Sequence, residues 1–146
     1  MFVQVLQNKE LFIHLLSKKE RTVLVQAFAY LAHLDNTLHQ TELDLISTIA
    51  HNLGLDPQII VADVGRLDLA DILQPIDNTQ SKRILLQELI NLAYADGNYS
   101  QEERIGIQKA ADILGIEPPV LTKIEKWVEK GRAWAQEGVE IILEGK

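Results

Sequence analysis

An internal repeat constrains the fold of this chain more than any other feature of its sequence. The segment from Gln26 to Pro57 aligns without a gap with the segment from Gln87 to Pro118, at an offset of 61 residues, and eleven of the 32 positions are identical. Several identical pairs are leucine, alanine or isoleucine, which suit a helical core, and a glycine and a proline recur where one helix would end and the next begin. The repeat therefore predicts two copies of a helix–loop–helix unit, packed as pseudo-symmetric halves of one domain.

Helical periodicity extends over nearly the whole chain. Apolar residues recur at three- to five-residue steps, and strand-like alternation is hard to find. Helices are expected over about residues 11–16, 17–34, 39–53, 57–65, 80–94, 101–114 and from 118 onward, with a short helix and a connection between 66 and 80. Gly131 and Gly138 are expected to weaken or divide the last helix. The sequence predicts an all-α fold, with seven or eight helices in one domain over residues 1–146 and repeats at about 18–64 and 80–128.

Composition excludes several functional classes. Hydrophobic residues make up 47% of the 146 residues, which is enough for a globular core and too many for a disordered chain. The absence of cysteine excludes disulfides, thiolate metal sites and cysteine nucleophiles. A net charge of −7 repels phosphate backbones, so nucleic acid is not an expected partner. No apolar run reaches the ~20 residues of a membrane helix, and a soluble cytoplasmic protein is expected.

Each copy of the repeat carries a pair of acidic residues around the loop between its helices. Asp35 and Glu42 form the pair in the first copy, and Asp96 and Glu103 form it in the second, seven residues apart in both. One interpretation is structural, because Ser100 and Glu103 fit a capping box and an aspartate before a turn residue can bond the loop backbone. The alternative is a metal site, since carboxylates on both sides of a loop can converge on a hard divalent cation. The spacing is not that of an EF-hand.

The second copy resembles a known protein family. Residues 92–103 have the sequence Leu-Ala-Tyr-Ala-Asp-Gly-Asn-Tyr-Ser-Gln-Glu-Glu and precede a helix ending at Leu114-Gly115-Ile116. This string resembles the TerB-like family of tellurite-resistance proteins, and the resemblance covers about residues 21–130. The resemblance implies an all-helical fold of two related halves and an association with resistance to tellurite and other chemical stress. It also implies a metal-binding role for Asp96 and Glu103, and more loosely for Asp35 and Glu42.

Two other groups of residues offer alternatives. Trp127 and Trp134 are seven apart and therefore lie on roughly one face of the last helix. Core packing is the expected role of these tryptophans, and the alternative is a face for a protein partner or a homodimer, since aromatic residues concentrate at binding hot spots. His33 and His39 flank Asp35, so a His-Asp-His ligand set is a further alternative.

The sequence carries no G-x-S-x-G, H-E-x-x-H or G-x-G-x-x-G signature, so we predict no catalytic residue and no organic cofactor. A hydrolase that uses the acidic loops is the weakest hypothesis. The leading prediction is a non-enzymatic stress-response protein of the TerB-like type that binds Ca²⁺, Mg²⁺, Mn²⁺ or Zn²⁺ through its acidic loops. The alternative is a helical adaptor or dimerisation module with no metal function, acting through an apolar face near Trp127 and Trp134.

Overall fold

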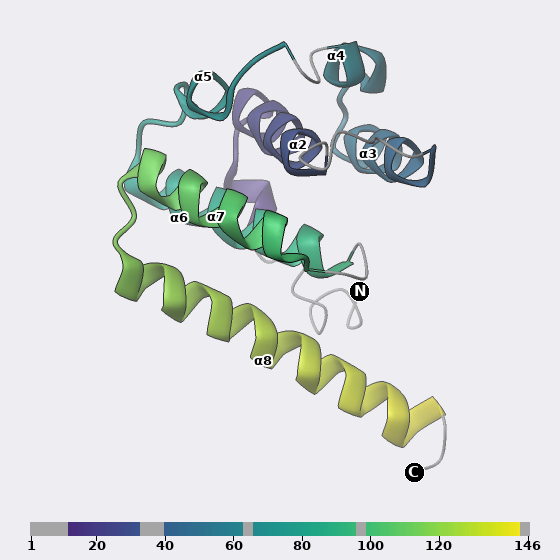
Figure 1. Ribbon diagram of the computed structural model, residues 1–146. Helices are drawn as coiled ribbons and strands as arrows, with labels where there is room; N and C mark the ends of the chain where they lie inside the picture. Colours follow the sequence, from purple (N-terminus) through teal and green to yellow (C-terminus); the bar gives the residue numbers. More distant parts are fainter. Residues whose placement is uncertain (1–11, 33–39, 63–65, 96–98, 144–146) are drawn as a thin grey trace.

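The computed structural model describes residues 12–32, 40–62, 66–95 and 99–143, and these residues form an all-helical fold (Figure 1). The elements are η1 (Ile13–Leu15), α2 (Lys18–Ala32), α3 (Gln40–Asn52), α4 (Pro57–Ala62), α5 (Leu69–Leu73), α6 (Thr79–Ala95), α7 (Gln101–Leu114) and α8 (Pro118–Leu143). The predicted all-α class is confirmed. In the described part of the chain six α-helices have six residues or more, whereas η1 and α5 are single turns, so seven or eight full helices is too high a number.

Helix α2 is the central helix because it is apolar on most of its surface. Its buried residues include Val23, Leu24 and Val25 in succession, which a helix with only one apolar stripe could not bury together. α2 contacts α3, α4, α5, α6 and α7 (Figure 1). The largest of its buried side chains, Phe28, is 2% exposed. The core therefore surrounds α2, and α8 packs against α6 and α7, where it adds Leu121 and Val128 to the core.

Local sequence signals determine where α2 begins. The backbone N–H of Ser17 donates to Glu20 Oε1 at 2.8 Å, and the backbone N–H of Glu20 donates to Ser17 Oγ at 3.1 Å. Each bond satisfies a donor that the first turn of a helix leaves without an intrahelical acceptor. Together the two bonds form a capping box at the start of α2.

Helices α3 and α7 end in the same kind of turn. Gly54 and Gly115 follow them with φ angles of 76° and 74°, a left-handed conformation that favours glycine. The residue after each glycine donates its N–H to a carbonyl of the preceding helix at 2.8 Å. Proline then begins α4 at Pro57 and α8 at Pro118. The aligned segments therefore share this helix end, while their relation as pseudo-symmetric halves stays a prediction.

Helix α8 is continuous from Pro118 to Leu143, so the prediction that Gly131 and Gly138 divide it is wrong. A glycine inside a helix costs about 1 kcal/mol relative to alanine. The buried Leu121 and Val128 stabilise the N-terminal half of α8 and so oppose the cost at Gly131. The C-terminal half extends past the other helices (Figure 1).

Candidate functional site

The structure describes only part of the predicted acidic site. Asp35 and Asp96 lie outside the described residues, as do His33 and His39. Glu42 lies in the first turn of α3, but its side chain is also outside the described part. A metal site formed by Asp35, Glu42, Asp96 and Glu103 therefore stays a prediction.

The side chain of Glu103 has a structural role at the start of α7. Its backbone N–H donates to Ser100 Oγ at 3.1 Å, and its Oε1 accepts the Ser100 backbone N–H at 3.1 Å. The predicted capping box at Ser100 and Glu103 is therefore confirmed, and Glu103 is 7% exposed. A cation at this end of α7 would share Glu103 with the cap, whereas the neighbouring Glu102 is exposed. Among the described residues no three histidine, aspartate or glutamate side chains are grouped closely enough to hold a metal ion.

Two tyrosines at the junction of α6 and α7 form hydrogen bonds with α8. The Tyr94 hydroxyl donates to Glu129 Oε1 at 2.7 Å, and the Tyr99 hydroxyl donates to Glu125 Oε2 at 3.3 Å. The two tyrosine rings meet edge to face with their centroids 4.9 Å apart, a favoured aromatic geometry. The sequence analysis missed this contact, although Glu125 and Glu129 are one helical turn apart and so lie on one face of α8.

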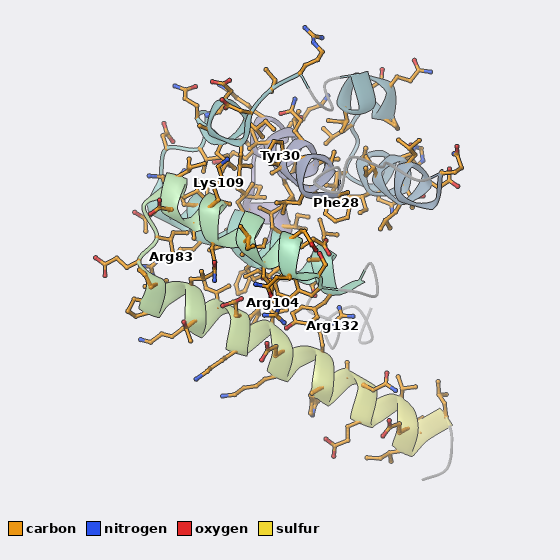
Figure 2. The ribbon with its side chains drawn as sticks, viewed as in Figure 1. Phe28, Tyr30, Arg83, Arg104, Lys109 and Arg132 are labelled. Carbon is orange, nitrogen blue, oxygen red and sulfur yellow. The ribbon has the colours of Figure 1, made fainter. Side chains whose placement is uncertain are left out.

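Burial and neighbouring carboxylates raise the pKa values of both tyrosines at this junction. Burial raises the pKa of Tyr99 above its usual range, and the charge of Glu125 raises this pKa further. Burial and the hydrogen bond to Glu129 likewise raise the pKa of Tyr94. Arg104 lies 4.2 Å from the centre of the Tyr99 ring, and its charge opposes both shifts. Figure 2 shows Arg104 and Arg132 between α7 and α8.

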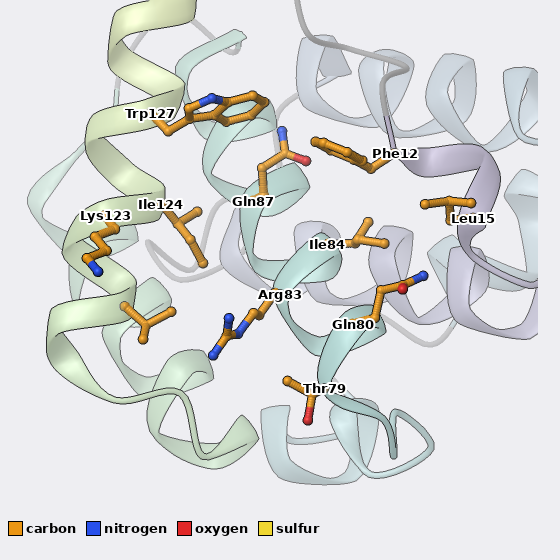
Figure 3. A pocket seen from close by; sticks show the side chains of 11 residues that line it. Phe12, Leu15, Thr79, Gln80, Arg83, Ile84, Gln87, Lys123, Ile124 and Trp127 are labelled. Atoms are coloured by element: carbon orange, nitrogen blue, oxygen red, sulfur yellow. The ribbon is translucent and has the colours of Figure 1, made fainter.

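A groove of about 880 Å³ lies between η1, α6 and α8 (Figure 3). Its described lining is mostly apolar and contains two cations and no acidic residue: Phe12, Leu15, Thr79, Gln80, Arg83, Ile84, Gln87, Val120, Lys123, Ile124 and Trp127. The rings of Phe12 and Trp127 approach each other, with centroids 6.0 Å apart. This volume falls in the range of small-molecule sites in proteins, roughly 300–1,000 Å³.

Gln87 is the one buried polar side chain among the described residues that line this groove. It is 6% exposed, and neither its Nε2 nor its Oε1 has a hydrogen-bond partner in the described part of the chain. Figure 3 shows its amide between the rings of Trp127 and Phe12. Gln87 was not among the residues predicted from the sequence to be functional. A signal was present, since Gln26 and Gln87 are an identical polar pair within a repeat dominated by core residues.

The C-terminal half of α8, residues 133–143, projects past the other helices and exposes a large apolar surface. Trp134 in this projecting half is 57% exposed, and Trp127 at the groove is 40% exposed, so the prediction that both tryptophans pack in the core is wrong. The exposed apolar residues of the projecting half continue to the end of the helix: Val139, Ile141, Ile142 and Leu143. The reason for the exposure from Trp134 onward is length, because α8 has 26 residues whereas α6 has 17 and α7 has 14. At about 1.5 Å per residue, α8 is too long for its neighbours to cover.

Comparison with known proteins gives one match. The family model described as "Tellurite resistance protein TerB" matches residues 65–126, which run from the start of the α5 region into α8 and are less than half of the chain. The resemblance inferred from residues 92–103 is thereby confirmed over this segment. No curated protein and no solved structure matches the chain. Within its described part, no helix has both the length and the hydropathy of a membrane span.

Proposed function

We propose that this TerB-like chain acts without catalysis, as a helical interaction module that self-associates through the projecting half of α8. The exposed apolar face of α8 carries the proposal. Trp134 and Ile141 are each more than half exposed, which is unusual for large apolar side chains that serve only the protein's own fold. Aromatic residues in such positions are typical anchors of protein interfaces.

The spacing along α8 favours a second copy of the chain as the partner. Trp127, Trp134 and Ile141 recur every seven residues, and Gly131 and Gly138 recur with the same period between them. These are the two core positions of a heptad repeat, in which side chains of one helix fill gaps in the other. When two such helices pair in opposite directions, the two kinds of position face each other. Trp134 of one copy would then pack on Gly138 of the other, and Ile141 on Gly131.

The surroundings of Gly138 support this pairing. A side chain added at Gly138 would meet no atom within 4 Å in its own protomer, so the space over this glycine is open to a partner's indole. Opposite helix directions would also place the two helical bodies at opposite ends of the pair. Because the projecting half is short, we expect a dimer that dissociates on dilution.

A matched pair of leucine variants tests the dimer. Gly138→Leu fills the proposed gap for Trp134 of the second copy, whereas Gln136→Leu adds the same side chain to the exposed opposite face of α8. Sedimentation equilibrium over a wide concentration range should show a dimer for the wild type and for Gln136→Leu, and a monomer for Gly138→Leu. Circular dichroism should show undiminished helix in both, since leucine is the better helix former. A wild type that stays monomeric at millimolar concentration, or a dimeric Gly138→Leu, would refute the proposal.

A second proposal assigns divalent-cation binding to the acidic loop. α6 ends at Ala95 and α7 begins at Gln101, so the connection between them is short; Asp96 follows α6 in the sequence, and Glu102 and Glu103 lie in the first turn of α7. Carboxylates arranged around a loop are suitable ligands for hard cations. The family name supports a role in resistance to tellurite or a related stress, which we place in the cytoplasm.

Thermal unfolding of chelator-stripped protein with Ca²⁺, Mg²⁺, Mn²⁺ or Zn²⁺ tests the metal proposal. A ligand at 100 times its Kd stabilises a protein by about 2.7 kcal/mol, which moves the midpoint by several degrees in a chain of this size. Glu103→Gln keeps the cap, because glutamine also serves in a capping box, but removes the charge. We expect a metal-dependent shift that is lost in Asp96→Asn and reduced in Glu103→Gln. No shift with any of the four metals would exclude the acidic loop as a cation site.

A further inference from the structure

The groove between η1, α6 and α8 contains an unsatisfied polar group in a wall whose surface is mostly apolar. Gln87 is more than nine-tenths buried, and its amide lies between the rings of Trp127 and Phe12, with both polar atoms enclosed (Figure 3). Among the described residues nothing donates to its Oε1 or accepts from its Nε2. Buried polar groups in folded proteins nearly always have partners, and the exceptions tend to have a functional explanation. A bound molecule would supply the missing donor and acceptor.

The two cations of the groove indicate the charge of that molecule. Arg83 precedes Gln87 by one turn of α6, and Lys123 precedes Trp127 by one turn of α8, so both cations lie toward the same end of the groove (Figure 3). No described lining residue is acidic. Guanidinium and ammonium groups that face no carboxylate of their own attract an anionic ligand, and arginine suits a carboxylate in particular.

The apolar side chains indicate the remainder of the molecule. Phe12, Leu15, Ile84, Ile124 and Trp127 form the walls, and Phe12, Leu15 and Trp127 are each more than one-third exposed. Such walls bind an alkyl or acyl chain through removal of apolar surface from water. The groove volume of about 880 Å³ matches a small ligand.

We propose that this groove binds a small amphipathic acid with an apolar tail and an amide N–H adjacent to a carboxylate, as in an N-acylated amino acid. In an extended amino-acid unit the N–H and a carboxylate oxygen lie on the same side, so one primary amide can pair with both. In the proposed complex the partly exposed rings of Trp127 and Phe12 move apart, so that Gln87 Oε1 accepts the N–H and Gln87 Nε2 donates to the carboxylate. Arg83 and Lys123, one turn further along α6 and α8, attract the carboxylate charge at longer range, and the acyl chain lies along Trp127 and Phe12. The site is independent of the projecting half of α8.

N-decanoylglycine, used below its critical micelle concentration, is the probe for this site. The chain has two tryptophans, so a Trp134→Phe background leaves Trp127 as the single fluorophore next to the ligand. Titration of the full chain should change Trp127 fluorescence saturably, and calorimetry on the wild type should give the same Kd. Decanoate lacks the amide N–H, and N-decanoylglycinamide lacks the carboxylate. Each should bind about tenfold more weakly, since each loses one of the paired hydrogen bonds or the ionic contact.

Variants separate the head-group contacts from simple apolar binding. Gln87→Leu keeps the groove apolar and should weaken N-decanoylglycine about tenfold while decanol binding is unchanged. Arg83→Gln should weaken the carboxylate ligand, and Lys109→Gln, which removes an exposed charge from α7 outside the groove, should not. Absence of saturable binding, or equal affinity for decanol and N-decanoylglycine, would overturn the proposal. So would tighter binding of a peptide with an apolar C-terminal residue, because the groove would then be a peptide site.

Discussion

Glu103 is a residue whose visible role and proposed role can be separated by substitution. Its carboxylate and its backbone both bond Ser100, so the side chain stabilises the start of α7. We expect Glu103→Ala to lower the free energy of unfolding by about 1 kcal/mol, the usual effect of losing a cap. The free energy of unfolding of Glu103→Gln should remain within a few tenths of a kcal/mol of the wild-type value. Urea denaturation without metal measures both, and equal stability of the alanine variant would contradict the capping role.

Tyr99 makes the free energy of unfolding depend on pH in the alkaline range. Burial raises the pKa of Tyr99 in the folded state above the ordinary value of about 10. Below pH ~10 both states carry the neutral phenol, so stability is at its full value. Above it the unfolded chain ionises first, and the free energy of unfolding falls as the pH rises toward the folded-state pKa. Denaturation at pH 9 and pH 11 should show this loss in the wild type and a smaller loss in Tyr99→Phe; equal losses would contradict it.

Helix α8 consists of an anchored half and a projecting half. The anchored half is held by Tyr94 and Tyr99, and by Arg132, whose Nη1 donates to Asn91 Oδ1 at 3.4 Å. The projecting half has exposed apolar residues and no comparable contact among the described residues. Local unfolding of the projecting half should therefore cost less free energy than local unfolding of the anchored half.

Amide hydrogen exchange tests this division of α8. At concentrations that favour the monomer, residues 133–143 should exchange fastest, residues 121–132 more slowly and α2 most slowly. Tyr94→Phe removes the hydrogen bond to Glu129 and should accelerate exchange in the anchored half without affecting α2. Tyr30→Phe, a matched change on α2, should leave α8 unchanged. Uniform exchange along α8 would contradict the division.

The sequence predicts where the helices begin and end better than it predicts which of their side chains are exposed or line a groove. The caps at Ser17 and Ser100 and the turns at Gly54 and Gly115 depend on residues a few positions apart, so their chemistry is visible in the sequence. The exposure of Trp134 depends on how far α8 extends past α6 and α7, which no local pattern encodes. The groove at Gln87 depends on three elements that meet only in the folded chain. Hydrophobic pattern alone therefore could not identify it.

At the scale of the whole molecule, net charge opposes the proposed dimer. Each copy carries a formal charge of −7, so two copies repel each other at low ionic strength, while the proposed contact is apolar. Salt screens the repulsion, since the Debye length falls from about 10 Å at 0.1 M to about 3 Å at 1 M. Association measured by sedimentation should therefore tighten between 50 mM and 500 mM NaCl. Weakening with salt would indicate that ion pairs hold the dimer instead.

The central position of α2 has a consequence for synthesis. α2 is complete at Ala32, yet two of the helices that cover it, α6 and α7, are complete only at Ala95 and Leu114. A nascent chain on the ribosome thus carries a strongly apolar helix without its covering until most of the protein has emerged. Native packing of the N-terminal half has to wait for the C-terminal half, and a chain that terminates early leaves a surface that chaperones bind and proteases cleave.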